Sequence, residues 1–155
     1  MSAPKISIDW QTVIAFLLRL ACGGVFLYAS QDKLGEAAKF MGILKEYHIL
    51  PAALIPLAAV VIPWLEFLTG ACLVAGFQWR GAALLFCALM GIYSLALGWN
   101  LLHGVEMNCG CFSMDSTEKI TWFSVLRDVG FFAMGFIVLT SPRTYFSLDR
   151  STNPK

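Results

Sequence analysis

The sequence contains 155 residues, of which 58% are hydrophobic and 14% are charged, and its formal net charge is +1. An ordinary soluble domain has roughly 25% charged residues, and a disordered chain has few apolar residues. The composition therefore argues against a soluble domain and against a disordered chain. The small net charge provides no basic field for nucleic acid, which argues against such a partner. The length and the apolar excess together predict a single domain that faces a lipid bilayer.

Four apolar stretches follow one another along the chain, and each has the length of about 20 residues that a membrane-crossing helix needs. The expected spans are residues 11–30, 51–77, 81–102 and 120–140. Between the first two, residues 31–50 carry apolar side chains at intervals that favour a short amphipathic helix at the membrane interface. We therefore predict an all-α bundle of four transmembrane helices with one short interfacial helix, followed by a polar tail over residues 141–155.

The basic residues of the connections predict the orientation of the bundle. The N-terminal segment, the second connection and the tail carry five Lys and Arg residues, against four in the first and third connections. By the positive-inside rule, we expect both termini in the cytoplasm and the first and third connections outside it. The first span contains Arg19, and we expect it to stay as an anchor rather than to be cleaved as a signal peptide.

The third connection holds two cysteines separated by one residue, Cys109 and Cys111. A disulfide across so short a link departs from relaxed geometry and is easily reduced, and Gly110 permits the backbone angles that it needs. Such a ring suits exchange, in which one thiolate attacks a partner's disulfide and the second thiol resolves the mixed disulfide. We predict that Cys109 and Cys111 are catalytic thiols. Their spacing does not identify the attacking residue, and by analogy with other cysteine pairs we expect Cys109.

Two other interpretations of this connection stay open. His103, Met107, Cys109 and Cys111 form a set of soft and borderline ligands that suits copper(I) or zinc. Alternatively, the connection is structural, and its thiols do nothing or pair elsewhere. The other three cysteines are Cys22, Cys72 and Cys87. They lie inside predicted spans, where a free cysteine packs as a small hydrophobe.

Two charges, Arg19 and Glu66, lie deep inside the predicted spans. A charge in the membrane costs a few kcal/mol or more, so it normally faces the bundle interior and has a partner. Each lies ~16 Å along its helix from the same side of the membrane, which predicts an Arg19–Glu66 ion pair. The pair would either fix helix packing or serve the function. Gly23 and Gly70 each follow one of these charges by four residues, and small residues there allow two helices to approach closely.

Three further polar residues lie nearer the third connection. Arg127 lies ~10 Å below it, within reach of an anionic headgroup, a quinone oxygen or a thiolate. Asp128 follows Arg127 and is a candidate third member of the Arg19–Glu66 pair. The amide of Asn100, near the end of the third span, is placed to bond a carbonyl oxygen. We therefore group these residues with the ion pair as a candidate substrate or quinone site.

Several short sequence elements together resemble one family of membrane proteins. They are Arg19 with Gly23 and Gly24, Lys33, YHILP at Tyr47–Pro51, PWLEFLTG at Pro63–Gly70, NCGCF at Asn108–Phe112, and LRD at Leu126–Asp128. In this combination, the chain resembles the DoxX-like membrane proteins and, more narrowly, the MauE proteins of methylamine utilisation. The resemblance extends over about residues 14–139.

The resemblance implies a four-helix protein of the bacterial inner membrane, linked to maturation of the disulfide-rich small subunit of methylamine dehydrogenase beside a thioredoxin-like partner. Wider relatives are tied to quinone-linked sulfur oxidation, which makes a quinone a candidate cofactor. We therefore predict a thiol–disulfide oxidoreductase whose cysteine pair reacts with a periplasmic thioredoxin-like protein or a maturing substrate. A non-catalytic assembly component and a copper-handling membrane protein stay open as alternatives, as does oligomerisation.

Overall fold

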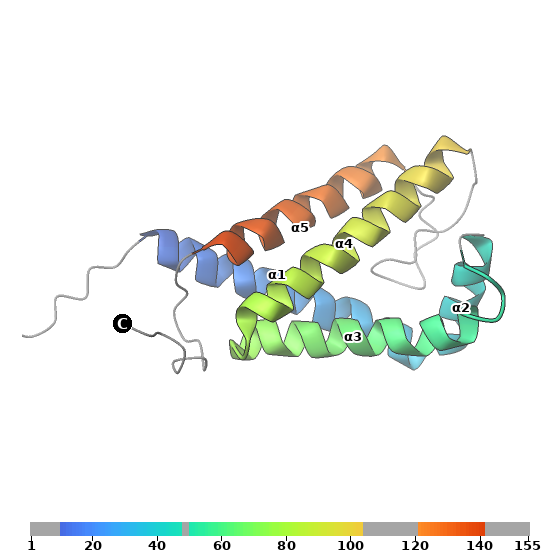
Figure 1. Cartoon of the computed structure of the whole chain (residues 1–155), viewed down its shortest axis with the longest axis horizontal. Helices are drawn as coiled ribbons and strands as arrows, with labels where there is room; N and C mark the ends of the chain where they lie inside the picture. Colours follow the sequence, from blue (N-terminus) through green and yellow to red (C-terminus); the bar gives the residue numbers. More distant parts are fainter. Residues whose placement is uncertain (1–9, 48–49, 104–120, 142–155) are drawn as a thin grey trace, which may run out of the picture.

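The computed structural model describes residues 10–47, 50–103 and 121–141, which form five α-helices. They are α1 (Trp10–Gly35), α2 (Ala37–Glu46), α3 (Ile55–Ala75), α4 (Trp79–Leu102) and α5 (Trp122–Thr140). The four long helices run alternately toward one end of the molecule and back, and α2 lies at the end where α1 finishes and α3 begins (Figure 1). Within these ranges there is no strand, and the predicted all-α architecture, with a short helix between the first two spans, is confirmed.

The four long helices have the length and composition of membrane spans. Their outward faces carry large apolar side chains, such as Leu57 and Leu95, which are 61% and 76% exposed. The charged side chains of Arg19 and Glu66 are buried instead, with exposed fractions of 0% and 1%. A molecule that is apolar outside and charged inside needs apolar surroundings, so the chain is a multi-pass membrane protein.

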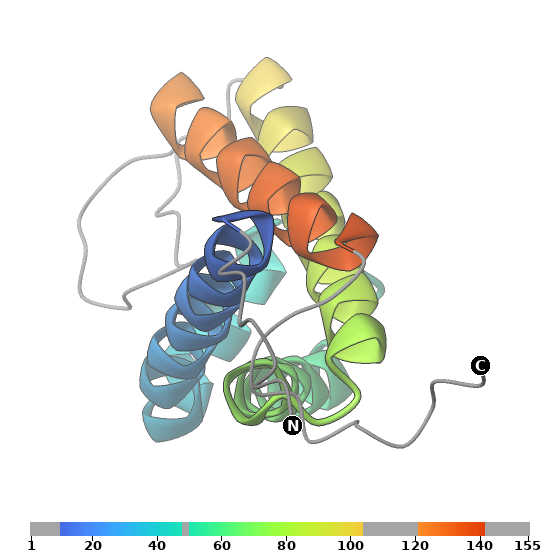
Figure 2. The ribbon, with the colours of Figure 1, turned by 90° about the vertical axis from the view of Figure 1, so that its left-hand side faces the viewer.

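The four spans pack in a ring in which α1 contacts α3, α3 contacts α4, α4 contacts α5, and α5 returns to α1 (Figure 2). The apolar core lies inside this ring. The rings of Phe26 on α1 and Phe86 on α4 meet there, with centroids 4.4 Å apart. Gly135 on α5 makes room for Phe86, because a Cβ at Gly135 would lie 2.6 Å from the Phe86 ring.

Two glycines bring α1 and α3 together. A Cβ added to Gly70 would lie 2.8 Å from the carbonyl oxygen of Gly23, and one added to Gly23 would lie 3.0 Å from the carbonyl oxygen of Gly70. Only residues without a side chain allow this approach, so the predicted role of both glycines is confirmed. Their contact fixes the antiparallel register of α1 and α3, which decides which polar side chains can meet.

The helix ends follow local signals more than the end of the apolar pattern. Helix α1 continues to Gly35, beyond the end of its apolar stretch at Ser30, and so includes Lys33. Helix α3 has a proline in its first turn and ends at Ala75, and the following Gly76 caps it with a φ of 72°, which favours a residue without a Cβ. The turn after Gly76 is short, and α4 begins at Trp79.

Candidate functional site

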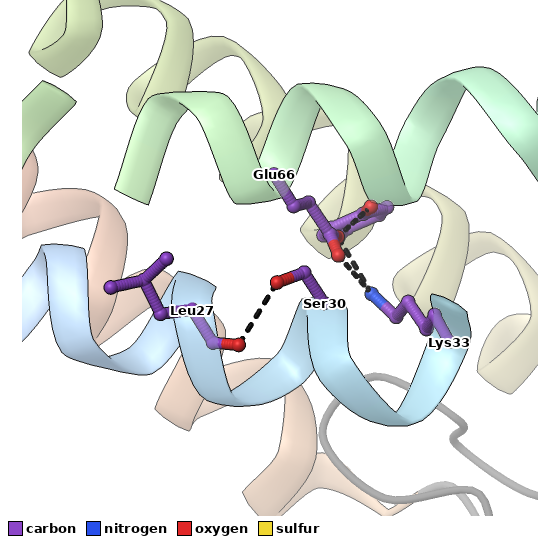
Figure 3. A network of polar contacts seen from close by, with 5 residues as sticks. Leu27, Ser30, Lys33 and Glu66 are labelled. Atoms are coloured by element: carbon purple, nitrogen blue, oxygen red, sulfur yellow. Dashed lines mark hydrogen bonds and ion pairs between the residues drawn. The ribbon is translucent and has the colours of Figure 1, made fainter. Parts of the chain in front are cut away.

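A buried ion pair between Lys33 on α1 and Glu66 on α3 forms the centre of the site. The Lys33 Nζ lies 2.6 Å from Oε1 and 2.8 Å from Oε2 of Glu66. The side chains are only 2% and 1% exposed, and they point toward each other between the two helices (Figure 3). Both carboxylate oxygens therefore accept a hydrogen bond from one ammonium group, which compensates part of the cost of burying two charges.

Tyr93 on α4 completes this pair. Its hydroxyl donates a hydrogen bond to Oε1 of Glu66. The Lys33 Nζ also lies 5.0 Å from the centroid of the Tyr93 ring and 5.4 Å from that of Phe40 on α2, distances at which an aromatic face attracts a cation. Four helices thus contribute to the surroundings of one ammonium group. We call Lys33, Glu66 and Tyr93 the polar cluster.

The predicted Arg19–Glu66 pair is wrong, because Glu66 pairs with Lys33 instead. From the contact of Gly23 with Gly70, Glu66 lies four residues toward one end of the bundle and Arg19 lies four residues toward the other. That offset separates them by ~12 Å along the helix axes. Side chains on a helix also lean toward its N-terminus, so Lys33 and Glu66 lean toward each other, whereas Arg19 leans away from Glu66.

Arg19 therefore lies apart from the polar cluster, although it is completely buried. Its guanidinium carbon lies 5.2 Å from the centroid of the Phe16 ring, one turn earlier in α1. Arg19 and Lys33 occupy the same buried stripe of α1 at a separation of ~21 Å, and the apolar residues Cys22 and Phe26 lie between them on that stripe.

Asp128 on α5 lies close to the polar cluster and is completely buried. Its Oδ1 is 3.4 Å from Nη2 of the neighbouring Arg127, whose side chain is 30% exposed. Asp128 interacts electrostatically with Arg127 and also with Lys33. Asp128 therefore does not join an Arg19–Glu66 pair as predicted, and it interacts with Lys33 electrostatically, without a hydrogen bond between them.

The remaining predicted residues separate into two groups. Asn100 is buried, but its amide donates a hydrogen bond of 2.9 Å to the carbonyl of Ala96 on its own helix. His103 is exposed and its Nδ1 lies 2.8 Å from the carbonyl of Trp99. Met107, Cys109 and Cys111 lie outside the described residues, so the predictions for the cysteine pair and for the alternative metal ligands stay predictions.

The sequence prediction did not include Lys33 or Tyr93 in the site. One signal was present for Lys33, because Arg19, Cys22, Phe26, Ala29 and Lys33 follow one another at steps of three and four. That spacing keeps all five on one helix face, so a buried arginine at one end implies a buried lysine at the other. For Tyr93 no comparable signal exists, since an aromatic residue in a span fits a core or a lipid-facing position equally well.

The fold and the site define a multi-pass membrane protein with a charged cluster in its core. The family model of the methylamine utilisation protein MauE matches residues 11–141 of the sequence. Since this match includes all four spans, the chain belongs to the MauE family. No solved structure matches it.

Individual relatives agree with this family. The methylamine utilization protein MauE of Paracoccus denitrificans is 28% identical over 131 residues, which are 84% of this chain and 70% of the relative. The MauE protein of Paracoccus versutus is 30% identical over 125 residues, 80% of this chain and 67% of the relative. The MauE protein of Methylorubrum extorquens is 30% identical over 119 residues, 76% of this chain and 61% of the relative. The matched segment thus spans about two thirds of each relative.

Proposed function

We propose that this chain is a membrane component of methylamine utilisation that exchanges disulfides through Cys109 and Cys111. The partner is a thioredoxin-like protein or a disulfide-containing substrate in the periplasm. The observation that carries the proposal is the position of the pair in the sequence, between the end of α4 and the beginning of α5. Both helix ends lie at the end of the bundle where α1 finishes, two residues beyond Lys33 (Figure 1).

The other cysteines support this assignment by contrast. Cys22, Cys72 and Cys87 are free thiols on α1, α3 and α4, inside the spans. Cys22 and Cys87 are buried and Cys72 is half-buried, so a water-soluble partner has no access to them through the bilayer. Membership of the MauE family supports the proposed role in methylamine utilisation. We also propose that the chain is related to the wider DoxX-like proteins.

The exchange proceeds in two steps. The thiolate of one cysteine attacks a sulfur of the partner's disulfide, whose S–S bond breaks as a mixed disulfide forms, and the departing sulfur takes up a proton. The second cysteine, as thiolate, then attacks the mixed disulfide, closes the Cys109–Cys111 ring and releases the partner as a dithiol. Two electrons thereby move to the partner, and the reverse sequence oxidises it. A quinol in the bilayer or a reduced second protein then returns the pair to the dithiol; in the reverse direction, a quinone or an oxidised second protein returns it to the disulfide.

The proposal includes an orientation. The chain lies in the bacterial inner membrane with both termini in the cytoplasm and with the Cys109–Cys111 connection in the periplasm. Labelling of intact cells with a membrane-impermeant thiol reagent under reducing conditions should modify Cys109 and Cys111. Labelling only after lysis would contradict this orientation.

The decisive experiment traps the mixed disulfide. In a methylamine-grown host, Cys111→Ser should accumulate a covalent adduct with a second protein, visible on a non-reducing gel and lost on reduction. Cys72→Ser is the matched control, because it removes a thiol inside a span and should leave growth unchanged without forming an adduct. If neither Cys109→Ser nor Cys111→Ser traps a protein, and the double variant grows normally on methylamine, the proposal fails.

A second candidate function is a non-catalytic assembly component, which is favoured by the ion pair of Lys33 and Glu66 because a buried pair of this kind stabilises the contact between two helices. In that case both cysteines are dispensable, whereas replacement of Glu66 or Arg19 destroys the protein by destabilising it. The copper-handling alternative predicts that metal copurifies with the protein and is lost in Cys109→Ser, which metal analysis would show.

A further inference from the structure

Among the described residues, the interior near the polar cluster contains two acids but one buried ammonium group. Glu66 and Asp128 are 1% and 0% exposed, and Lys33 is 2% exposed. Lys33 contacts both oxygens of Glu66 and interacts with Asp128 only at longer range. Arg127 contacts Asp128 at 3.4 Å but is 30% exposed and adjacent to it in the sequence. Adjacent residues on a helix do not face each other, so this contact is geometrically poor.

Asp128 also has an unsatisfied oxygen. Within the described part of the chain, its Oδ2 is buried and has no hydrogen-bond partner. Its other oxygen, Oδ1, accepts two long hydrogen bonds of 3.4 Å from Nε and Nη2 of Arg127. A buried oxygen without a donor makes the ionised carboxyl more costly than the neutral one. Binding a proton reduces this cost.

A hydroxyl lies at the same level on the neighbouring helix. The contacts of Gly91 with Phe132, and of Gly135 with Cys87, fix an antiparallel register of α4 and α5. In this register, Ser94 lies opposite Asp128. The Oγ of Ser94 is likewise buried and lacks a hydrogen-bond partner among the described residues. Two unsatisfied polar groups therefore lie at one level of two packed helices.

We propose that Asp128 and the polar cluster form a proton-binding site within the membrane, in which two carboxyl groups share one proton across Lys33. With Lys33 on Glu66, as in the structure, Asp128 carries the proton. When the Lys33 ammonium moves to Asp128, that carboxyl releases its proton and Glu66 takes one up, so the total charge is unchanged. In the part of the chain that the structure describes, the charged groups that act on Asp128 are Arg127 on α5 and Lys33 on α1, and Lys33 in turn contacts Glu66 and Tyr93.

This site goes beyond disulfide exchange and needs no partner protein, so it is tested on the purified full chain in dodecyl maltoside micelles, because this detergent has no carbonyl group that absorbs in the same region. Infrared spectroscopy at neutral pH detects the C=O stretch of a protonated carboxyl, whereas carboxyl groups in water are ionised and silent there. We expect one such band in the unmutated protein. Incorporation of aspartate carrying ¹³C in its side-chain carboxyl should shift this band, which assigns it without a substitution.

Three variants then test the sharing of the proton. Asp128→Asn and Glu66→Gln should each reduce the band to background, because one acid then remains for one ammonium group. Asp32→Asn is the matched control, since it removes a half-buried carboxyl next to Lys33 and should leave the band intact. Absence of the band, its insensitivity to the aspartate label, or its persistence in Glu66→Gln would overturn the proposal. None of these outcomes depends on the cysteines, so disulfide exchange can fail while the proton site holds.

Discussion

The interface between α1 and α3 has two halves that are held together differently. In one half, Gly23 and Gly70 let the two backbones touch, and a Cβ on Gly70 would lie 2.8 Å from the Gly23 carbonyl oxygen. In the other half, Lys33 reaches across to Glu66 with two short hydrogen bonds. Lipid tails are as apolar as a helix face, so close packing and not hydrophobic burial stabilises the first half. The second half is stabilised by the attraction between two opposite charges, which stay paired because the bilayer cannot solvate them.

The comparison shows that the packed half decides how the charged half pairs. The glycine contact sets the register of the two helices, and the register places Glu66 on the side of Lys33 and away from Arg19. Backbone contact tolerates no additional atoms, whereas long side chains adapt over several ångströms. The two halves should therefore respond differently to substitution.

The largest effect is expected for Lys33→Met, which breaks the charged half. Of its partners among the described residues, Glu66 would keep the Tyr93 hydroxyl alone, so the free energy of unfolding should fall by about 3–5 kcal/mol. Reversible unfolding from detergent micelles into dodecyl sulfate, followed by the helical circular dichroism signal, measures this loss. Lys39→Met is the matched control, because Lys39 pairs with Glu36 at the same distance of 2.6 Å with both side chains about half exposed. It should cost less than about 0.5 kcal/mol.

The double variant Lys33→Met/Glu66→Met separates an unpaired charge from lost packing. Removing both charges should restore most of the stability lost in Lys33→Met, since apolar residues of similar volume often replace a buried ion pair at little cost. A double variant as unstable as Lys33→Met would mean that the pair is required for packing as such, and not because one charge must neutralise the other.

The packed half should be next in sensitivity. Gly70→Ala introduces a Cβ against the Gly23 backbone, which must move, and we expect a loss of about 1–3 kcal/mol in the same unfolding measurement. Gly24→Ala is the control, because a Cβ there meets nothing within 4 Å, and alanine favours a helix over glycine by up to about 1 kcal/mol. Equal effects of both substitutions would show that helix propensity, rather than the backbone contact, determines the result.

Much of the fold is predictable from the sequence, because the length of each apolar stretch fixes the number of spans. The close approach at Gly23 and Gly70 is also predictable, since few other residues permit it. The pairing of charges is not predictable from depth alone. When depth is counted in residues from Ser30, the expected end of the first span, Arg19 lies level with Glu66. Helix α1 in fact continues to Gly35, so the depth counted from the helix end is different. A helix end depends on polar residues and caps that do not alter the apolar count.

The site is predictable only in part, for a related reason. Glu66 and Asp128 stand out because a buried acid in a span is rare, and both lie in or beside the cluster. Lys33 lies just past the apolar stretch, where a lysine normally extends to the membrane surface, so its burial depends on the tertiary structure. Tyr93 becomes recognisable only when α4 is placed next to α3.

The smallest of the three effects is expected for Tyr93→Phe, which removes one hydrogen bond from the charged half and leaves both charges in place. Glu66 would still be bound by Lys33 through both carboxylate oxygens. The loss should therefore be about 0.5–1.5 kcal/mol, the size of a single polar contact between membrane helices. Tyr28→Phe, at a position 60% exposed on α1, should leave unfolding unchanged and serves as the control. A loss for Tyr93→Phe as large as that for Lys33→Met would show that the hydroxyl, and not the ammonium group, stabilises the buried charge of Glu66.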